Sequence, residues 1–231
     1  LEHAGIKYKT KVNINFVLAD TITTRNVKKL IGSNDAVLVP GGFGDRGVEG
    51  MITACKFARE NNIPYLGICL GMQVAIIEYS RNVLGLRNSN STEFNPNTKY
   101  PVIALITEWS DGTGKKQKRN KNSDLGGTMR LGGQVCKIKK PSNAFNMYKK
   151  IEIIERHRHR YEVNPDFAED MSNSGLEVVG TSVDDKLVEM VEIKNHKWFL
   201  ACQFHPEFTS NPRDGHPIFN SYIKSTIENN E

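Results

Sequence analysis

A cysteine flanked by glycines is the residue whose setting most strongly suggests chemistry. Gly67, Cys69 and Gly71 form a G-x-C-x-G motif between a short apolar run and a run with helical spacing. Glycines allow a sharp strand-to-helix turn that leaves the central side chain exposed. At a helix N-terminus, unpaired N–H groups and the helix dipole favour a thiolate. Cys69 is therefore predicted to be a nucleophile. The alternative, a buried structural cysteine, fits Cys55 on its predicted helix.

The partners of such a thiol occur near the C-terminus, in the sequence C-Q-F-H-P-E. His205 and Glu207 are two residues apart, so an extended backbone maintained by Pro206 would place both side chains on the same side. A neutral imidazole can accept the thiol proton and return it to a leaving amine, and a carboxylate on its other nitrogen fixes its tautomer. Cys69, His205 and Glu207 are therefore the predicted catalytic residues.

A glycine-rich turn near residue 44 has two interpretations. Gly42, Gly44 and Gly47 satisfy the G-x-G-x-x-G dinucleotide pattern between a predicted strand and a predicted helix. However, the next predicted strand runs into Cys69 and carries no acidic residue at its end to hold a ribose. We therefore favour an oxyanion hole made by the backbone N–H groups of Gly42 and Leu70.

The sequence R-H-R-H-R at 156–160 could bind a cation or an anion. On a strand, His157 and His159 would share one face and could ligate a metal, but the three interleaved arginines oppose a cation. We predict no metal site. Binding of a substrate carboxylate and a solvated basic strand both remain open for this segment.

Composition limits the classes of protein that these residues can belong to. The chain has 231 residues, of which 38% are hydrophobic and 25% charged, and its formal net charge is +5. Four scattered cysteines without a C-x-x-C pair argue against a disulfide framework or a zinc knuckle and favour a reducing, cytoplasmic location. The longest apolar stretch, 63–72, is interrupted and too short for a membrane span. The basic run 115–121 lacks aromatic residues, so we predict a solvated loop and no nucleic-acid partner.

The pattern of elements predicts where the chemistry must lie. Strands at 12–18, 36–39 and 63–68 alternate with helices at 47–60 and 72–80. This βαβα order predicts parallel strands, with active-site residues just after the strand ends.

The second half of the chain has a different pattern and predicts antiparallel pairing. The segment 110–127 is expected to be a surface loop or lid. The remaining elements are strands at 101–106, 128–138, 151–163, 176–182, 187–193 and 198–204, followed by a helix over 218–227. The predicted fold is one α/β domain over residues 1–231, with a mostly parallel central sheet flanked by helices and an antiparallel extension.

Several of these motifs together resemble a known family. G-I-C-L-G, V-P-G-G-F-G and H-P-E resemble the class I glutamine amidotransferases, whose fold is a mostly parallel sheet between helices. S-D-L-G-G-T-M-R-L-G at 123–132 and E-R-H-R-H-R-Y at 155–161 resemble, more narrowly, the glutaminase domains of CTP synthases. The resemblance covers nearly the whole chain.

This resemblance implies roles for individual residues. Cys69 would attack the side-chain amide of L-glutamine, ammonia would leave, and a glutamyl thioester would be hydrolysed with help from His205 and Glu207. Gly42 and Leu70 would hold the oxyanion. The residues that would hold the substrate are Gln73, Glu93 and Arg160.

The resemblance also implies partners beyond this chain. No cofactor is expected in this domain. A synthase domain of the same polypeptide would use ATP and Mg²⁺ to aminate UTP to CTP, GTP would be an allosteric activator near 121–131, and the full-length protein would be a homo-oligomer, a tetramer. The synthase domain, the family's first strand and most of its first helix are expected to precede the segment at 1–5. A γ-glutamyl hydrolase and a non-catalytic regulatory module remain as alternatives.

Overall fold

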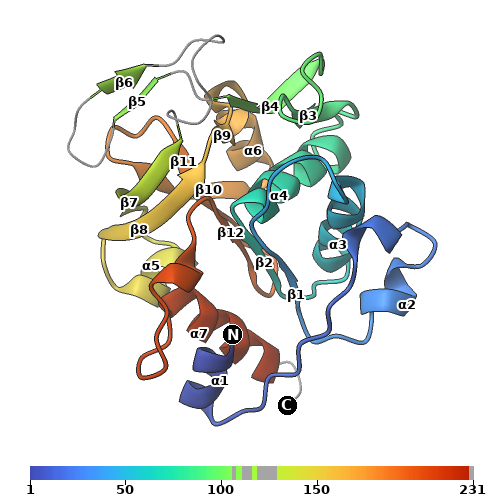
Figure 1. The fold of residues 1–231 in the computed structure, drawn as a ribbon, viewed down its shortest axis with the longest axis vertical. Helices are drawn as coiled ribbons and strands as arrows, with labels where there is room; N and C mark the ends of the chain where they lie inside the picture. Colours follow the sequence, from blue (N-terminus) through green and yellow to red (C-terminus); the bar gives the residue numbers. More distant parts are fainter. Residues whose placement is uncertain (106–107, 111–115, 119–128, 229–231) are drawn as a thin grey trace.

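A computed structural model describes residues 1–105, 108–110, 116–118 and 129–228 (Figure 1). At its centre is a seven-stranded mixed sheet with the order β1-β2-β12-β11-β10-β7-β8. Helices cover the sheet, so the predicted α/β class is confirmed.

The parallel part of the sheet is formed by three strands. β1 (Val37–Val39) pairs with β2 (Tyr65–Ile68), and β2 pairs with β12 (Phe199–Cys202). α3 (Val48–Glu60) follows β1 and α4 (Leu70–Asn82) follows β2, as the alternation of apolar runs predicted. The carboxyl ends of β2 and β12 therefore lie side by side.

The antiparallel extension is also confirmed. It continues from β12 through four strands, which are β11 (Val188–Ile193), β10 (Leu176–Ser182), β7 (Arg130–Ile138) and β8 (Glu152–His159). β8 alternates strictly between exposed and buried residues, the pattern of a strand with one face against the core.

The core has two parts because the central strands are buried on both faces. Tyr65 and Phe199 belong to the cluster that packs with α3 and α4, and their neighbours Leu66 and Leu200 belong to the cluster on the other face. That second cluster packs against α1 (Glu2–Tyr8), α5 (Asn143–Tyr148) and α7 (Pro217–Ile227). This two-sided burial explains why 63–68 reads as a continuous apolar run.

Smaller elements complete the described residues. One small sheet contains β3 (Ser89–Ser91), β4 (Tyr100–Leu105) and β9 (Tyr161–Val163), and another contains β5 (Glu108–Ser110) and β6 (Lys116–Lys118). The short helices are α2 (Val27–Ile31), α6 (Ala168–Ser174) and the 3₁₀ turns η1 (Ala19–Thr21), η2 (Pro165–Phe167) and η3 (Pro206–Phe208). Among the helices described, none has the length and apolarity needed to cross a bilayer.

Three predicted elements differ from the structure. The predicted strand 12–18 is wrong: its alternating apolar residues Ile14, Phe16 and Leu18 are exposed, and no described strand pairs with the segment. The predicted strand 151–163 is divided at Arg160 into β8 and β9, which join different sheets. The predicted loop 110–127 includes β6, and most of its other residues lie outside the described part of the chain.

Candidate active site

Cys69 occupies the turn between β2 and α4 in a conformation that few residues adopt. Its φ is 52° and its ψ is −101°, and it caps the N-terminus of α4. The flanking glycines are needed because the backbone doubles back: a Cβ on Gly67 would lie 2.5 Å from the carbonyl oxygen of Gly71, and a Cβ on Gly71 would collide with the carbonyl oxygen of Val39. The sharp turn predicted from G-x-C-x-G is therefore present.

The thiol of Cys69 is buried and protonated at rest. Its residue is 2% exposed, and burial raises its pKa to about 12, with further increases from the nearby charges of Glu162, Glu207 and Glu93. The N–H of Leu70 points at the sulfur and lowers the pKa, but by less than burial raises it. The N–H groups at the start of α4 favour the thiolate as expected, but loss of hydration on burial has the larger effect on the pKa of Cys69.

His205 and Glu207 are brought together as predicted, but by a different backbone. The Nδ1 of His205 lies 2.7 Å from a carboxylate oxygen of Glu207. Pro206 does not keep the segment extended: it begins the 3₁₀ turn η3, in which the N–H of Phe208 donates to the carbonyl of His205. The Nε2 of His205 is buried and has no hydrogen-bond partner among the described residues, so it is available to a substrate or a thiol.

Gly41 lies between the cysteine and the histidine. A Cβ placed on it would be 2.7 Å from Cε1 of His205 and 3.4 Å from Cβ of Cys69. The two side chains therefore converge on the same glycine. Backbone hydrogen bonds hold this arrangement, because the N–H of Cys69 donates to the carbonyl of Cys202 and the N–H of His205 donates to the carbonyl of Arg156.

The glycine turn contacts the same site. A Cβ on Gly42 would lie 3.0 Å from a methyl carbon of Leu70, so these two predicted oxyanion residues are neighbours. The N–H of Gly44, whose φ is 79°, donates to Oε1 of Glu93 at 3.0 Å. This bond fixes the carboxylate of Glu93 beside the turn.

Of the other two predicted glutamine-holding residues, Arg160 lies at the junction of β8 and β9, and Gln73 contacts that junction from α4. Gln73 on α4 is 4% exposed, and its Nε2 donates to the carbonyl of Tyr161 at 3.1 Å. Arg160, which precedes Tyr161, is the half-buried residue between β8 and β9. α4 and the β8–β9 junction therefore meet beside Cys69.

Sequence reasoning missed Gln203, which links several of these residues. Its Nε2 lies 3.6 Å from Sγ of Cys69, and its Oε1 lies 3.4 Å from Nε2 of Gln73. Its side chain is fully buried. The only feature of the sequence that could have indicated a role for Gln203 is its position between Cys202 and His205 in C-Q-F-H-P-E.

The basic strand has two different faces. His157 and His159 are buried on one face, whereas Arg156 and Arg158 are exposed on the other. Within the described ranges, no group of three or more potential metal ligands occurs. The guanidinium of Arg158 lies 5.8 Å above the ring of Phe43 in the glycine turn. Of the expected activator segment, 121–128 lies outside the described residues, and Arg130 begins β7.

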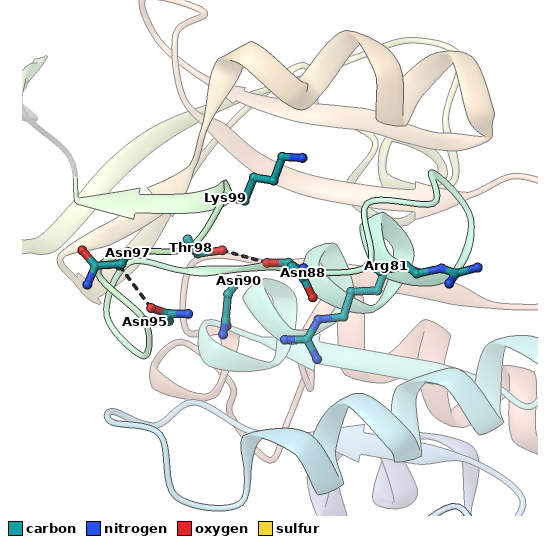
Figure 2. A pocket seen from close by; sticks show the side chains of 8 residues that line it. Arg81, Asn88, Asn90, Asn95, Asn97, Thr98 and Lys99 are labelled. Carbon is teal, nitrogen blue, oxygen red and sulfur yellow. Dashed lines mark hydrogen bonds between the residues drawn. The ribbon is translucent and has the colours of Figure 1, made fainter.

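A hollow of about 460 Å³ lies away from these residues, at the end of α4 and around β3 (Figure 2). Figure 2 shows asparagine side chains around it, with Thr98 bonded to the backbone of Asn88 and Asn97 bonded to Asn95. Its lining contains neither a thiol nor an imidazole, so none of the predicted catalytic residues lies in it. The lining residues are Arg81, Arg87, Asn88, Asn90, Asn95, Asn97, Thr98 and Lys99.

Comparison with known proteins agrees with this geometry. The sequence profile of the class I glutamine amidotransferases matches residues 1–225. The glutaminase domain of the Trypanosoma brucei CTPS, solved with bound acivicin, is 38% identical and superposes with a TM-score of 0.88, covering 98% of this chain and 85% of that one. A putative GMP synthase component from Thermoplasma acidophilum shares the fold at 16% identity and a TM-score of 0.58, covering 97% of this chain and 86% of that one. This chain therefore belongs to the class I glutamine amidotransferase family.

Proposed function

We propose that this chain is the glutaminase domain of a CTP synthase, which hydrolyses L-glutamine and supplies the ammonia that converts UTP to CTP. The observation that carries the proposal is the 38% identity to a CTPS glutaminase domain over 98% of the chain. The convergence of Cys69, His205 and Glu207 at the ends of two adjacent parallel strands supports it.

The first step begins from a neutral thiol. Because burial holds the pKa of Cys69 at about 12, the thiol must lose its proton as it attacks. His205 accepts that proton at Nε2, while the carboxylate of Glu207 at Nδ1 stabilises the resulting imidazolium. Sγ then bonds to the amide carbon of glutamine.

Breakdown of this adduct releases ammonia. The imidazolium of His205 returns its proton to the amide nitrogen, the C–N bond breaks, and a thioester remains on Cys69. Water then attacks the thioester with His205 as base, yielding glutamate and the thiol. The N–H groups of Leu70 and Gly42 hold the oxygen that becomes negative in both halves of the reaction. The placement of the Leu70 N–H at the sulfur favours this role.

Substrate holding is assigned to Glu93, Arg160 and Gln73. Glutamine carries an α-ammonium group and an α-carboxylate, which call for one anion and one cation. Glu93 is anchored beside the glycine turn by the N–H of Gly44. Arg160 stands at the β8–β9 junction, next to the carbonyl that accepts from Gln73.

The acceptor chemistry is proposed to lie outside this chain. A synthase domain of the same polypeptide would bind ATP, Mg²⁺ and UTP, with GTP as activator and a tetramer as the assembly. This domain itself needs no cofactor for the steps above, which use only side chains and backbone N–H groups.

Three measurements test the proposal. Purified protein should convert glutamine to glutamate and ammonia, and the polypeptide that contains this chain should make CTP from UTP, ATP and glutamine. Release of glutamate without CTP from the complete polypeptide would favour the γ-glutamyl hydrolase. Failure of a glutamine-like electrophile to label Cys69 would favour a non-catalytic module.

A further inference from the structure

The side chain of Gln203 lies against the sulfur of Cys69, and the steps proposed above give it no role. Gln203 is fully buried and Cys69 is 2% exposed, so water is excluded from their contact. The Nε2 of Gln203 lies 3.6 Å from Sγ of Cys69, a hydrogen bond lengthened by the large radius of sulfur. An amide nitrogen donates and does not accept, so the sulfur is the acceptor in this bond.

A backbone carbonyl determines which end of the Gln203 amide faces the thiol. The carbonyl oxygen of Tyr161 can only accept, so Gln73 must turn its Nε2 toward it, at 3.1 Å. The same Nε2 lies 3.4 Å from Oε1 of Gln203. If the Gln203 amide were reversed, two NH₂ groups would face each other and an oxygen would face the sulfur. The bonds that start at Tyr161 therefore direct an N–H of Gln203 at Sγ.

The main chain of Gln203 is also held in place. Its N–H donates to the carbonyl of Glu189 on β11 at 2.9 Å, and a carboxylate oxygen of Glu189 lies 2.8 Å from Nη2 of Arg130. The carbonyl of the preceding residue, Cys202, accepts from the N–H of Cys69. The donor and the sulfur are therefore positioned before substrate binds, and the donor needs no reorganisation during the reaction.

The surroundings of the sulfur make a donor valuable there. Burial and three nearby carboxylates oppose a negative charge on Cys69. The carboxylates are those of Glu162, Glu207 and Glu93. The N–H of Leu70 favours the negative charge, but the mechanism above assigns that N–H to the substrate oxygen. When Leu70 holds the oxyanion, Gln203 remains as a donor to the sulfur.

We propose that Gln203 is a catalytic residue, whose Nε2–H stabilises the negative charge that Sγ of Cys69 acquires as the thiol proton passes to His205. A neutral thiol is a weak acceptor, whereas a thiolate forms a charge-assisted bond, so the contact strengthens in the transition state. The same N–H stabilises the sulfur again when water has attacked the thioester and the C–S bond breaks. His205 then returns a proton to the departing thiolate. This inference rests on the glutaminase activity proposed above.

Two opposing effects determine how much the contact contributes. Loss of a hydrogen bond to an anion should shift the equilibrium between thiol and thiolate by about tenfold or more. A thiolate that is harder to form is also a stronger nucleophile, which recovers about half of the loss on a logarithmic scale. The net loss in the rate of attack is therefore expected to be about three- to tenfold.

Gln203→Met tests the proposal, because methionine fills a similar volume without an N–H. We expect kcat for glutamine hydrolysis to fall by about three- to tenfold, with a KM within about twofold of wild type. Alkylation of Cys69 by iodoacetamide at pH 8 should also slow by about threefold or more, because less thiolate is present. Its rate should still rise with pH as in wild type.

Gln134→Met is the matched control, since Gln134 is a buried glutamine on β7 whose Nε2 donates to the carbonyl of Leu131. This variant should keep the wild-type kcat and the wild-type alkylation rate. Wild-type values of both rates in Gln203→Met, or an equal loss in the two variants, would overturn the proposal.

A measurement on the wild type does not depend on how the variants fold. In ¹⁵N-labelled protein, a side-chain amide proton of Gln203 should show a nuclear Overhauser effect to the β-protons of Cys69. Its absence would reject the orientation of the Gln203 amide.

The alkylation experiment uses no glutamine, so it separates this proposal from the proposed function. Slower alkylation of Gln203→Met in a protein that hydrolyses no glutamine would reject the proposed function and support the contact with the sulfur. Glutamine hydrolysis by wild type, with alkylation unchanged in Gln203→Met, would reject the role of Gln203 alone.

Discussion

The backbone N–H of Cys69 donates to the carbonyl oxygen of Cys202 at 2.7 Å. This bond joins the carboxyl ends of β2 and β12, strands separated by more than half of the sequence. It places the thiol of Cys69 beside the segment that carries Gln203 and His205. The active site therefore depends on parallel pairing between the first and last parts of the chain.

Replacing the nucleophile should abolish glutamine hydrolysis. Cys69→Ser substitutes a much weaker nucleophile, and kcat should fall by about 10³-fold or more. In the complete polypeptide, CTP synthesis from added ammonia should survive. The matched control is Cys55→Ser, at a fully buried cysteine on α3, which should keep more than about a tenth of the activity. Equal loss of glutamine-dependent and ammonia-dependent synthesis would contradict this assignment.

The buried thiol should make Cys69 slow to alkylate at neutral pH. With a pKa of about 12, only a small fraction is thiolate, so alkylation by iodoacetamide should rise roughly tenfold per pH unit from pH 7 to 9. A plateau below pH 9 would show that the thiol ionises far more easily. The rate is measured by mass spectrometry of the Cys69 peptide.

Folding stability should also depend on this thiol at alkaline pH. The folded pKa of Cys69 is raised from 9.0 to about 12, so above pH 9 the unfolded chain loses this proton first. The stabilising contribution is present below that pH and is lost as pH rises toward 12. Urea denaturation between pH 9 and 11 should show a steeper loss of stability in wild type than in Cys69→Ser. Parallel curves would exclude the effect.

Gly41→Ala should damage catalysis through His205. The new Cβ would lie 2.7 Å from the imidazole and must displace it, so kcat should fall by about tenfold or more. Gly133→Ala is the control: its Cβ would meet only a methyl carbon of the exposed Ile154, at 3.1 Å. A normal kcat in Gly41→Ala would show that catalysis does not require the imidazole of His205 to lie where the structure places it.

Loss of the Arg160 cation should weaken glutamine binding. Arg160→Ala is expected to raise the KM for glutamine by about tenfold or more, because a charged hydrogen bond to the α-carboxylate is lost. Arg87→Ala, in the hollow of Figure 2, should leave KM unchanged. A raised KM in Arg87→Ala together with an unchanged KM in Arg160→Ala would indicate that glutamine binds in the hollow instead.

Much of the fold could be predicted because the periodicity of apolar residues in the sequence matches the faces that are buried in the structure. β10 occupies the predicted residues, and α3 differs by one residue at its start, since apolar periodicity and flanking turn residues mark both. The segment 12–18 shows the limit of such patterns. Alternating apolar residues indicate a strand only if a neighbouring strand pairs with them, and no described strand does so.

Part of the candidate site could also be predicted from the sequence, because its residues follow predicted strands. Residues just after strands, such as Cys69, could be grouped because parallel strands end at the same edge. The pairing of His205 with Glu207 followed from their separation, although the 3₁₀ turn that achieves it did not. The partners of Arg130 could not be predicted, because a β-bulge on a distant strand aims Glu189 at it.

The conformation of Cys69 implies a trade-off between stability and function. A non-glycine residue with positive φ at a functional turn costs on the order of 1–3 kcal/mol, which the surrounding packing must offset. A glycine at this position would relax the backbone and lack the thiol. The protein thus retains a less stable turn than a glycine at residue 69 would give, which is the arrangement expected if this side chain is the proposed nucleophile.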